Sequence, residues 1–293
     1  MEKFEQIVQN NNEMKNSKSE MSTIKERKVI WHYTNFKAFC NILGQGHLWL
    51  CNTKGMNDKN EMLAFIYQVE KLIKARHPSF SKLIHAFFKK EIARHQHKSI
   101  YGSSFSYLAN DAAQWERYGY AGKGVSIGFD LENLLKISSP FMIENVSYSR
   151  DYRNRDFEKL LPEEIFTGAG TYLSKEKIDR IFGLLWATSG AYKDYSFKSE
   201  MEIRLMTTPI SATDTTPYGD IHYDAAFDKI REYIIFDIKK LCAEHNLNIQ
   251  DLITEVIIGP KSTQNIIILQ NFLTELGYSR IAKCVHVSDC PLR

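Results

Sequence analysis

Residues 197–206 read FKSEMEIRLM, and apolar and charged side chains alternate along the stretch. One side of such a segment would carry Phe197, Met201, Ile203 and Leu205, and the other Lys198, Glu200, Glu202 and Arg204. Because successive side chains of a β-strand point to opposite faces, this alternation predicts a strand with one apolar and one polar face. We therefore expect a β-sheet in which this strand presents its charged residues together.

Short runs rich in β-branched and aromatic residues predict the other strands. They lie at residues 29–33, 48–51, 100–106, 125–129, 146–148, 255–258 and 281–287. Apolar residues at helical spacing, with capping residues before them, predict helices between these strands. The helices lie at 36–43, from Asp58 to Pro78, from Ser81 onward, from Asn110 or Asp111 to Gly119, at 178–189, at 237–245 and at 263–276. The sequence thus predicts an α+β fold with a mixed β-sheet core and helical insertions.

The chain divides into a short polar arm and one long domain. Residues 1–27 contain few apolar side chains and several Asn and Lys clusters, which is typical of a disordered or weakly helical arm. Residues 28–293 show no internal repeat and no linker, so we expect a single domain.

Composition narrows the class of protein. The net charge of +3 comes from 38 basic and 35 acidic residues, a balance too even to indicate nucleic-acid binding over the whole surface. The five cysteines are scattered without a Cys-x-x-Cys pair, which favours reduced thiols and no metal site. No apolar run approaches the roughly 20 residues that span a bilayer, and the N-terminus lacks a secretory signal. We expect a cytoplasmic protein with no membrane partner.

Glu200 and Glu202 are the first candidates for chemistry. Residues two apart on a strand lie about 7 Å apart on one face, so the two carboxylates would form a pair flanked by Lys198 and Arg204. One carboxylate of such a pair can stabilise a developing cation while the other positions a nucleophile. The alternative is a solvated strand face on which these charges form ion pairs.

His32 and Tyr33, on the first expected strand, are the second candidates. The histidine could hydrogen-bond a ribose or phosphate, and the tyrosine could stack on a base, although a strand histidine can also be purely structural. Ser104 and Ser106 would let a ligand approach the strand backbone. Trp115 and Tyr118 could enclose an aromatic cation such as a nicotinamide ring, or could pack in the core.

The order of these segments resembles a widespread bacterial domain family of unknown function, from about Ile30 to Arg293. The resemblance is carried by His32-Tyr33-Thr34, Asn57-Asp58-x-x-Glu61, Ser104-Phe105-Ser106, Trp115-x-x-Tyr118-Gly119, residues 124–129, Lys198-x-Glu200-x-Glu202-x-Arg204, and Ile257-Ile258-Gly259-Pro260.

The chain is more loosely similar to ADP-ribosyltransferases. These enzymes have a first-strand His or Arg, then a Ser-Thr-Ser or Tyr-bearing strand, then a Glu-x-Glu or Gln-x-Glu strand. Here His32, Ser104 to Ser106 and Glu200-x-Glu202 follow that order, with Ser-Phe-Ser in place of Ser-Thr-Ser and with Tyr101 and Tyr118 as candidates for the tyrosine.

The similarity implies a sheet of ADP-ribosyltransferase-like type over residues 28–293 and NAD as co-substrate, with no metal. Glu202 would be the catalytic glutamate and Glu200 would orient the acceptor, while His32 would hold the adenosine ribose. The other residues expected to bind NAD are Tyr33, Ser104, Ser106, Trp115, Tyr118 and Arg204. The acceptor would be a macromolecule. Such bacterial enzymes often serve as toxins or in phage defence, which implies an antitoxin or regulatory partner. The alternatives are an NAD glycohydrolase and a non-enzymatic module that binds nucleic acid or protein.

Local basic clusters favour nucleic acid over protein as the acceptor. They comprise Lys71, Lys74 and Arg76 on one expected helix, and Lys89, Lys90, Arg94 and Lys98 on or after the next. If these helices flank the site, they could guide a polyanion by counterion release. A solvated helix surface is the alternative.

Overall fold

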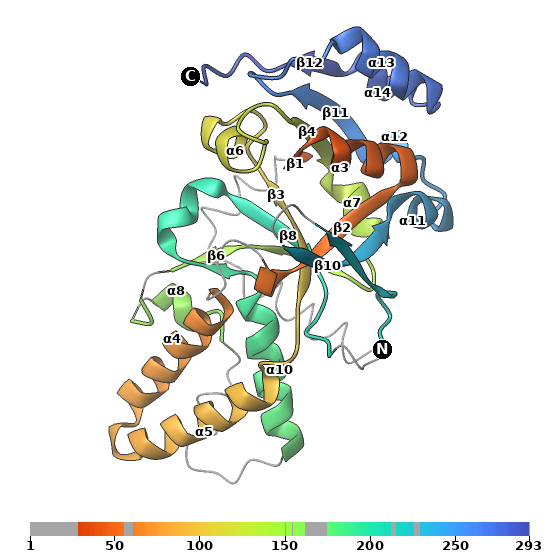
Figure 1. Ribbon diagram of the computed structural model, residues 1–293. Coiled ribbons are helices and arrows are strands. Elements are labelled where there is room, and N and C mark those ends of the chain that lie inside the picture. Colours follow the sequence, from red (N-terminus) through yellow and green to blue (C-terminus); the bar gives the residue numbers. More distant parts are fainter. Residues whose placement is uncertain are drawn as a thin grey trace.

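One mixed β-sheet organises the part of the chain that the structure describes (Figure 1). The computed structural model describes residues 29–55, 61–149, 151–153, 155–161, 175–211, 215–225 and 229–292. Helices and strands both contribute, so the predicted α+β class is confirmed. The predictions for residues 1–27 and for Asn57 and Asp58 lie outside the described residues. None of the helices in the described ranges is long and apolar enough to cross a membrane.

The main path of the sheet runs in the order β12, β11, β4, β1, β3, β2, β10, β9, and β3 also pairs with β8, which pairs with β5. All these pairings are antiparallel except that of β11 with β12. The strands are β1 (Val29–Thr34), β2 (His47–Asn52), β3 (Tyr101–Ser106), β4 (Val125–Asp130), β5 (Met142–Asn145), β8 (Glu202–Met206), β9 (Ile221–Ala225), β10 (Ile230–Asp237), β11 (Ile253–Ile258) and β12 (Val285–Val287). A separate parallel pair joins β6 (Ser147–Tyr148) to β7 (Tyr192–Lys193).

Strand β3 pairs over most of its length with one strand on one side and only briefly with two strands on the other. On one side it pairs with β8 from Gly102 to Ser106. On the other side β1 reaches it at Ser106, whereas β2 reaches it at the opposite end, at Tyr101 and Gly102. Strands β1 and β2 therefore diverge over the middle of β3. On that side no described strand pairs with the β3 backbone between Gly102 and Ser106.

Two groups of helices cover different parts of the sheet. The larger hydrophobic core lies between the sheet and α3 (Phe36–Cys40), α7 (Leu131–Ile137), α11 (Ile238–Glu244), α12 (Ile249–Leu252), α13 (Ile266–Glu275) and α14 (Ser279–Lys283). A second core joins α4 (Glu61–Arg76), α5 (Ser81–His95), α8 (Arg155–Glu158) and α10 (Lys175–Ser189). Figure 1 shows α4, α5 and α10 projecting together from the end of the molecule opposite α13 and α14.

Several predicted elements are confirmed, and their ends follow from local capping. The predicted helix 36–43 is α3 followed by η1 (Asn41–Gln45). Helix α6 (Ala112–Arg117) begins at Asp111, whose side chain accepts a hydrogen bond from the Gln114 amide, the usual role of an N-cap aspartate. Pro78 follows the end of α4, as predicted, and opens the short helix η3 (Pro78–Phe80).

The strand predicted at 197–206 is wrong in its first half. Residues Tyr195–Glu200 form the 3-10 helix η4, which Asp194 caps through the Ser196 amide. Met201 has a left-handed backbone, with φ of 45°, and turns the chain into β8. Every residue of β8 is buried, so its polar face, which carries Glu202 and Arg204, is not solvated. The alternation of residue types therefore did not indicate a strand with one solvent-exposed face.

Other segments also differ from prediction. Strands β5, β9 and β10 were not predicted. Residues 281–284, predicted as strand, instead complete α14 and its C-cap, so that β12 begins only at Val285. In β10 the less buried N-terminal end carries Arg231 and Glu232, both partly exposed, while the apolar run comes later, at Ile234, Ile235 and Phe236. This uneven burial hides the period-two signal that a half-buried strand would show.

Candidate functional site

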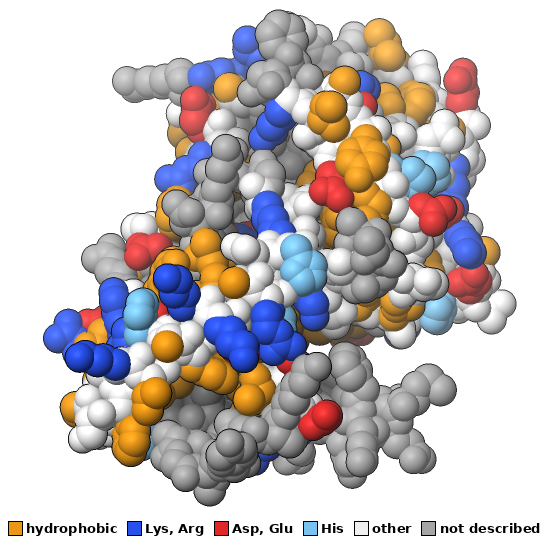
Figure 2. Space-filling view, turned by 60° about the horizontal axis from the view of Figure 1, so that its bottom comes forward, with side chains coloured by type: hydrophobic (Ala, Val, Ile, Leu, Met, Phe, Trp, Pro, Cys, Tyr) orange, Lys and Arg blue, Asp and Glu red, His pale blue; other side chains and the backbone are white. Residues whose placement is uncertain are grey.

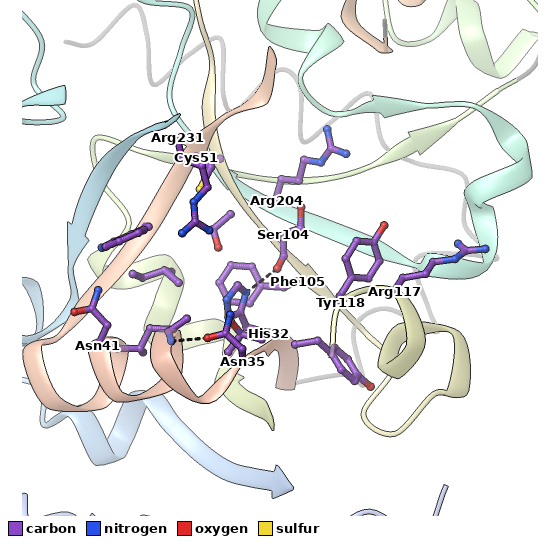
Figure 3. Close-up of a pocket in the computed structure, with 18 of the residues that line it drawn as sticks. His32, Asn35, Asn41, Cys51, Ser104, Phe105, Arg117, Tyr118, Arg204 and Arg231 are labelled. Carbon is purple, nitrogen blue, oxygen red and sulfur yellow. Dashed lines mark hydrogen bonds between the residues drawn. The ribbon is translucent and has the colours of Figure 1, made fainter. Parts of the chain in front are cut away.

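A cleft with a volume of about 1420 Å³ opens over the gap between β1 and β2 (Figure 3). Its lining residues lie on or next to β1, α3, η1, β2, β3, α6, β7, η4, β8, β9 and β10. Figure 3 shows His32 and Ser104 in the middle, Tyr118 and Arg117 on one flank, and Cys51 and Arg231 on the other. Segments 170 residues apart in sequence therefore meet at one surface, since His32 and Glu202 both line the cleft.

Glu202 lies at the first position of β8, opposite Ser106 of β3. Its carboxylate accepts hydrogen bonds from Arg204 Nε at 2.6 Å, from Arg204 Nη2 at 3.2 Å and from Lys193 Nζ at 3.0 Å. Burial alone would raise the pKa of Glu202, but the charge and hydrogen bonds of Arg204, the charge of Lys193 and the Ser104 hydroxyl outweigh it and hold this pKa at about 2. Glu202 is therefore ionised throughout the neutral range.

Glu200 lies at the end of η4 rather than on the strand, yet it faces the same cation as Glu202. Lys193 Nζ donates to Glu200 at 2.6 Å. The second carboxylate oxygen of Glu200 accepts from Arg117 Nη1 at 2.8 Å and from the Tyr118 hydroxyl at 3.0 Å. Burial and then the nearby Glu200 charge raise the pKa of Tyr118 to about 12, against the opposing effect of Lys193, so the hydroxyl keeps its proton and donates.

Lys193 is the central cation of the site, and the sequence analysis did not single it out. It lies on β7, and like Glu200, Glu202 and Arg204 it is 7% exposed or less. Burial would lower the pKa of Lys193, but the Glu202 charge and the hydrogen bond to Glu200 raise it, so Lys193 stays charged. Nothing in the local sequence Tyr-Lys-Asp-Tyr distinguishes this lysine from a surface residue. The buried cluster excludes the alternative of a solvated strand face.

His32 fills the gap in the sheet beside β3. Its Nδ1 lies 3.0 Å from the Ser104 carbonyl oxygen and donates to it, because a carbonyl can only accept (Figure 3). Burial lowers the pKa of His32 from 6.5, against the raising effect of this hydrogen bond, so the ring is neutral at pH 7. In that tautomer Nε2 carries a lone pair and acts as an acceptor. Nε2 has no hydrogen-bond partner among the described residues.

The other predicted residues divide between lining and support. Ser104 lines the cleft, whereas Ser106, also at its edge, is occupied: its hydroxyl donates to the Glu200 carbonyl at 2.7 Å and accepts from the Leu108 amide at 3.1 Å. Tyr33 is mostly buried and donates to the Leu108 carbonyl at 2.8 Å. Tyr118 is partly exposed in the lining.

The structure does not bring Trp115 to the cleft. Its side chain is fully buried, packs edge-on against Tyr33 at 4.9 Å between ring centroids, and donates from Nε1 to Asn110 at 2.7 Å. The core-packing alternative therefore describes Trp115, and Tyr118 is the aromatic residue that this helical segment presents to a ligand.

The basic helices α4 and α5 do not flank the cleft, since none of its lining residues belongs to them. Figure 2 shows Lys and Arg side chains gathered on this helical part of the surface. Several of them are already paired: Lys74 with Glu70, Arg76 with Glu158, and Arg94 with Glu91 and Asp179. The condition under which these helices would guide an acceptor to the site is not met.

The cleft itself is rich in positive charge. Among the described residues its lining includes seven Lys or Arg side chains and four Asp or Glu side chains. The basic residues are Lys37, Lys54, Arg117, Lys193, Arg204, Lys229 and Arg231. No group of three or more His, Cys, Asp or Glu side chains in the described ranges is arranged to hold a metal ion.

Residues 114–205 match the sequence model of DUF2971, a family described as a protein of unknown function. The matched segment is less than half of the chain. It runs from α6 to β8 and includes Tyr118, Lys193, Glu200, Glu202 and Arg204. This finding supports the resemblance to a family of unknown function over that segment. No curated protein and no solved structure matches the chain.

Proposed function

We propose that this protein is an NAD-dependent ADP-ribosyltransferase-like enzyme that modifies a macromolecule. The observation that carries the proposal is the single cleft lined by His32, Ser104 and Glu202. These residues come from β1, β3 and β8, which are neighbours in the sheet. They also follow the His, Ser, Glu order of the enzymes that the sequence resembles.

Glu202 has the properties that this chemistry needs. In the transfer step the bond between ribose C1′ and the nicotinamide nitrogen breaks, and its electron pair leaves with nicotinamide. The ribose is left as an oxocarbenium ion, which an acceptor nucleophile attacks at C1′ before losing its proton to solvent. A carboxylate with a pKa of about 2 is fully ionised and can stabilise that cation electrostatically. Arg204 and Lys193 fix its position, although they also offset part of its charge.

His32 and the basic lining suit the rest of the dinucleotide. The Nε2 lone pair of neutral His32 would accept a hydrogen bond from a ribose hydroxyl, whereas a phosphate oxygen, itself an acceptor, would be a poor partner. The excess of Lys and Arg over Asp and Glu in the lining would attract the pyrophosphate. Tyr118 would cover the nicotinamide.

Glu200 acts as a positioning residue in this proposal. Both of its carboxylate oxygens already accept hydrogen bonds, from Lys193, Arg117 and Tyr118. An acceptor could be oriented by Glu200 only if it displaced Arg117, whose side chain is 48% exposed, or Tyr118. A role as a toxin or in phage defence is proposed from the resemblance alone.

Incubation of the full chain with NAD labelled in the adenylate phosphate, together with whole-cell extract, tests the proposal. Label that enters a macromolecule supports transfer, and its loss on nuclease or on protease treatment identifies the acceptor class. Free labelled ADP-ribose without incorporation would favour the NAD glycohydrolase. If calorimetry detects no NAD binding at all, the enzyme proposal fails and the binding-module alternative gains.

A further inference from the structure

The flank of the cleft formed by β2, β10 and β9 carries an aromatic stack that the proposed NAD chemistry does not use. Trp49 and Tyr233 are stacked at 3.9 Å between centroids with an interplanar angle of 17°. His222 continues the stack on the other side, at 5.5 Å from Tyr233. The three residues come from three adjacent strands, with Tyr233 directly opposite His222 in the register.

The stack lies at the edge of the folded interior: Tyr233 is buried, whereas Trp49 and His222 are partly exposed. Trp49 and Tyr233 belong to none of the three hydrophobic cores of the described residues, although their neighbours Leu48, Leu50 and Ile234 do. Trp49 is partly exposed and lines the cleft. A large aromatic side chain that packs on another ring and faces a cleft is a platform on which a further flat ring can stack.

Arg231 lies over the Trp49 ring and adds a polar group to the platform. Its guanidinium carbon lies 5.8 Å from the Trp49 ring centroid, and its Nη2 donates to Asp224 at 2.7 Å. Its Nε is buried and has no hydrogen-bond partner among the described residues, but the side chain as a whole is 39% exposed. The exposed N–H groups of this guanidinium can donate to an acceptor atom of a ligand in the cleft. Figure 3 places Arg231 beside Cys51, across the cleft from Arg117 and Tyr118.

The cleft is also large for one small molecule. Small-molecule sites commonly occupy about 300–1,000 Å³, whereas this cleft measures about 1420 Å³. A dinucleotide that reaches from His32 to Glu202 would leave the flank with Trp49 and Arg231 open to a second ligand.

We propose that this flank binds one nucleotide of a single-stranded nucleic acid. Its base would stack against Trp49, and a phosphate or base oxygen would accept from the exposed part of the Arg231 guanidinium. Aromatic platforms combined with Arg are the usual means of binding single strands, whereas the bases of a duplex are not free to stack on a side chain. As an acceptor site this inference rests on the proposed function, but the binding itself does not require it.

The adenylate of NAD also has a base and a phosphate that could occupy this flank. The experiment therefore measures RNA binding and NAD binding separately. Binding of a short fluorescent single-stranded RNA is measured by anisotropy without NAD, in parallel with an abasic strand of equal length. NAD binding to each variant is measured separately by calorimetry. We expect Trp49→Ala to weaken RNA binding about tenfold and to leave abasic-strand binding and NAD binding unchanged.

Two variants control for indirect effects. Trp49→Phe keeps a stacking ring and should retain most of the affinity for RNA. Tyr223→Ala removes a 65% exposed aromatic side chain from β9 that does not line the cleft, and should bind RNA like the wild type. The inference is overturned if the wild-type chain binds both strands equally or not at all, if Trp49→Ala has no effect beyond that of Tyr223→Ala, or if Trp49→Ala loses NAD binding. Failure of the wild-type chain to bind NAD would refute the proposed function and leave the RNA result standing.

Discussion

At the scale of single residues, the site depends on pairing between buried charges of opposite sign. Glu200 and Glu202 are balanced by Lys193 and Arg204, and all four side chains are 7% exposed or less. Removing one member of such a cluster leaves an uncompensated buried charge, which is far more costly than the loss of a surface ion pair.

Lys193→Met tests this compensation. We expect the free energy of unfolding to fall by about 3 kcal/mol or more, because two carboxylates lose their shared donor. Lys198→Met is the matched control, since Lys198 is exposed on η4 only five positions away, and should change stability by no more than about 0.5 kcal/mol. Urea unfolding of both variants checks this, and equal losses would show that Lys193 has no special role.

His32 gives a pH dependence of defined sign. Burial puts its pKa in the folded chain below 6.5, so the ring is neutral at pH 7 and gains a proton only in more acidic solution. Protonation turns Nε2 from an acceptor into a donor. NAD affinity should therefore be constant above about pH 6.5 and should fall as the pH decreases below it. His32→Phe, which keeps a ring, should bind weakly at every pH. Calorimetric affinities that stay flat between neutral and acidic pH in the wild-type chain would contradict this role.

At the scale of elements, sequence patterns found most helices and strands but misassigned the segment that carries the site. The alternation at 197–206 is genuine, yet Asp194 caps a 3-10 turn and Met201 reverses the backbone, so only Glu202 and Arg204 of the charged set lie on a strand. Glu200 still meets Glu202 because Lys193, from another strand, bonds both. Such a contact between segments leaves no local signal.

Two glycines differ in the space that surrounds them for a side chain. A Cβ on Gly259 would meet the Gly122 carbonyl oxygen at 2.4 Å, whereas a Cβ on Gly183, within α10, would meet nothing within 4 Å. The Gly259-Pro260-Lys261-Ser262 segment that follows β11 is thus packed backbone to backbone against another loop. We expect Gly259→Ala to lower the melting temperature. Gly183→Ala should raise it slightly, because Ala is about 1 kcal/mol more favourable than Gly within a helix. Thermal unfolding of both variants checks the two signs, and a stabilised Gly259→Ala variant would show that this loop packing is wrong.

At the scale of the whole molecule, the cleft arises because β1 and β2 diverge from β3. The sequence allowed His32, Ser104 and Glu202 to be chosen by residue type and chain order. It did not reveal Lys193, Arg117 or the Trp49 stack, because their roles depend on strand order and on packing between distant segments. Trp115 illustrates the converse: an aromatic residue in a convincing motif is a core residue, since the fold turns its ring inward.

The most direct test of the central claim is the rate of NAD turnover by Glu202→Gln, compared with the wild type. The substitution keeps the size of the side chain but removes the negative charge that would stabilise the oxocarbenium ion. Its loss should reduce the rate by about 10²–10³. Because Glu202 is buried against two cations, unfolding must be measured in parallel, and NAD affinity serves as evidence that the cleft is intact. Glu244→Gln, at a 51% exposed carboxylate on α11, controls for charge removal. A folded Glu202→Gln chain that binds NAD and turns it over at the wild-type rate would contradict the account.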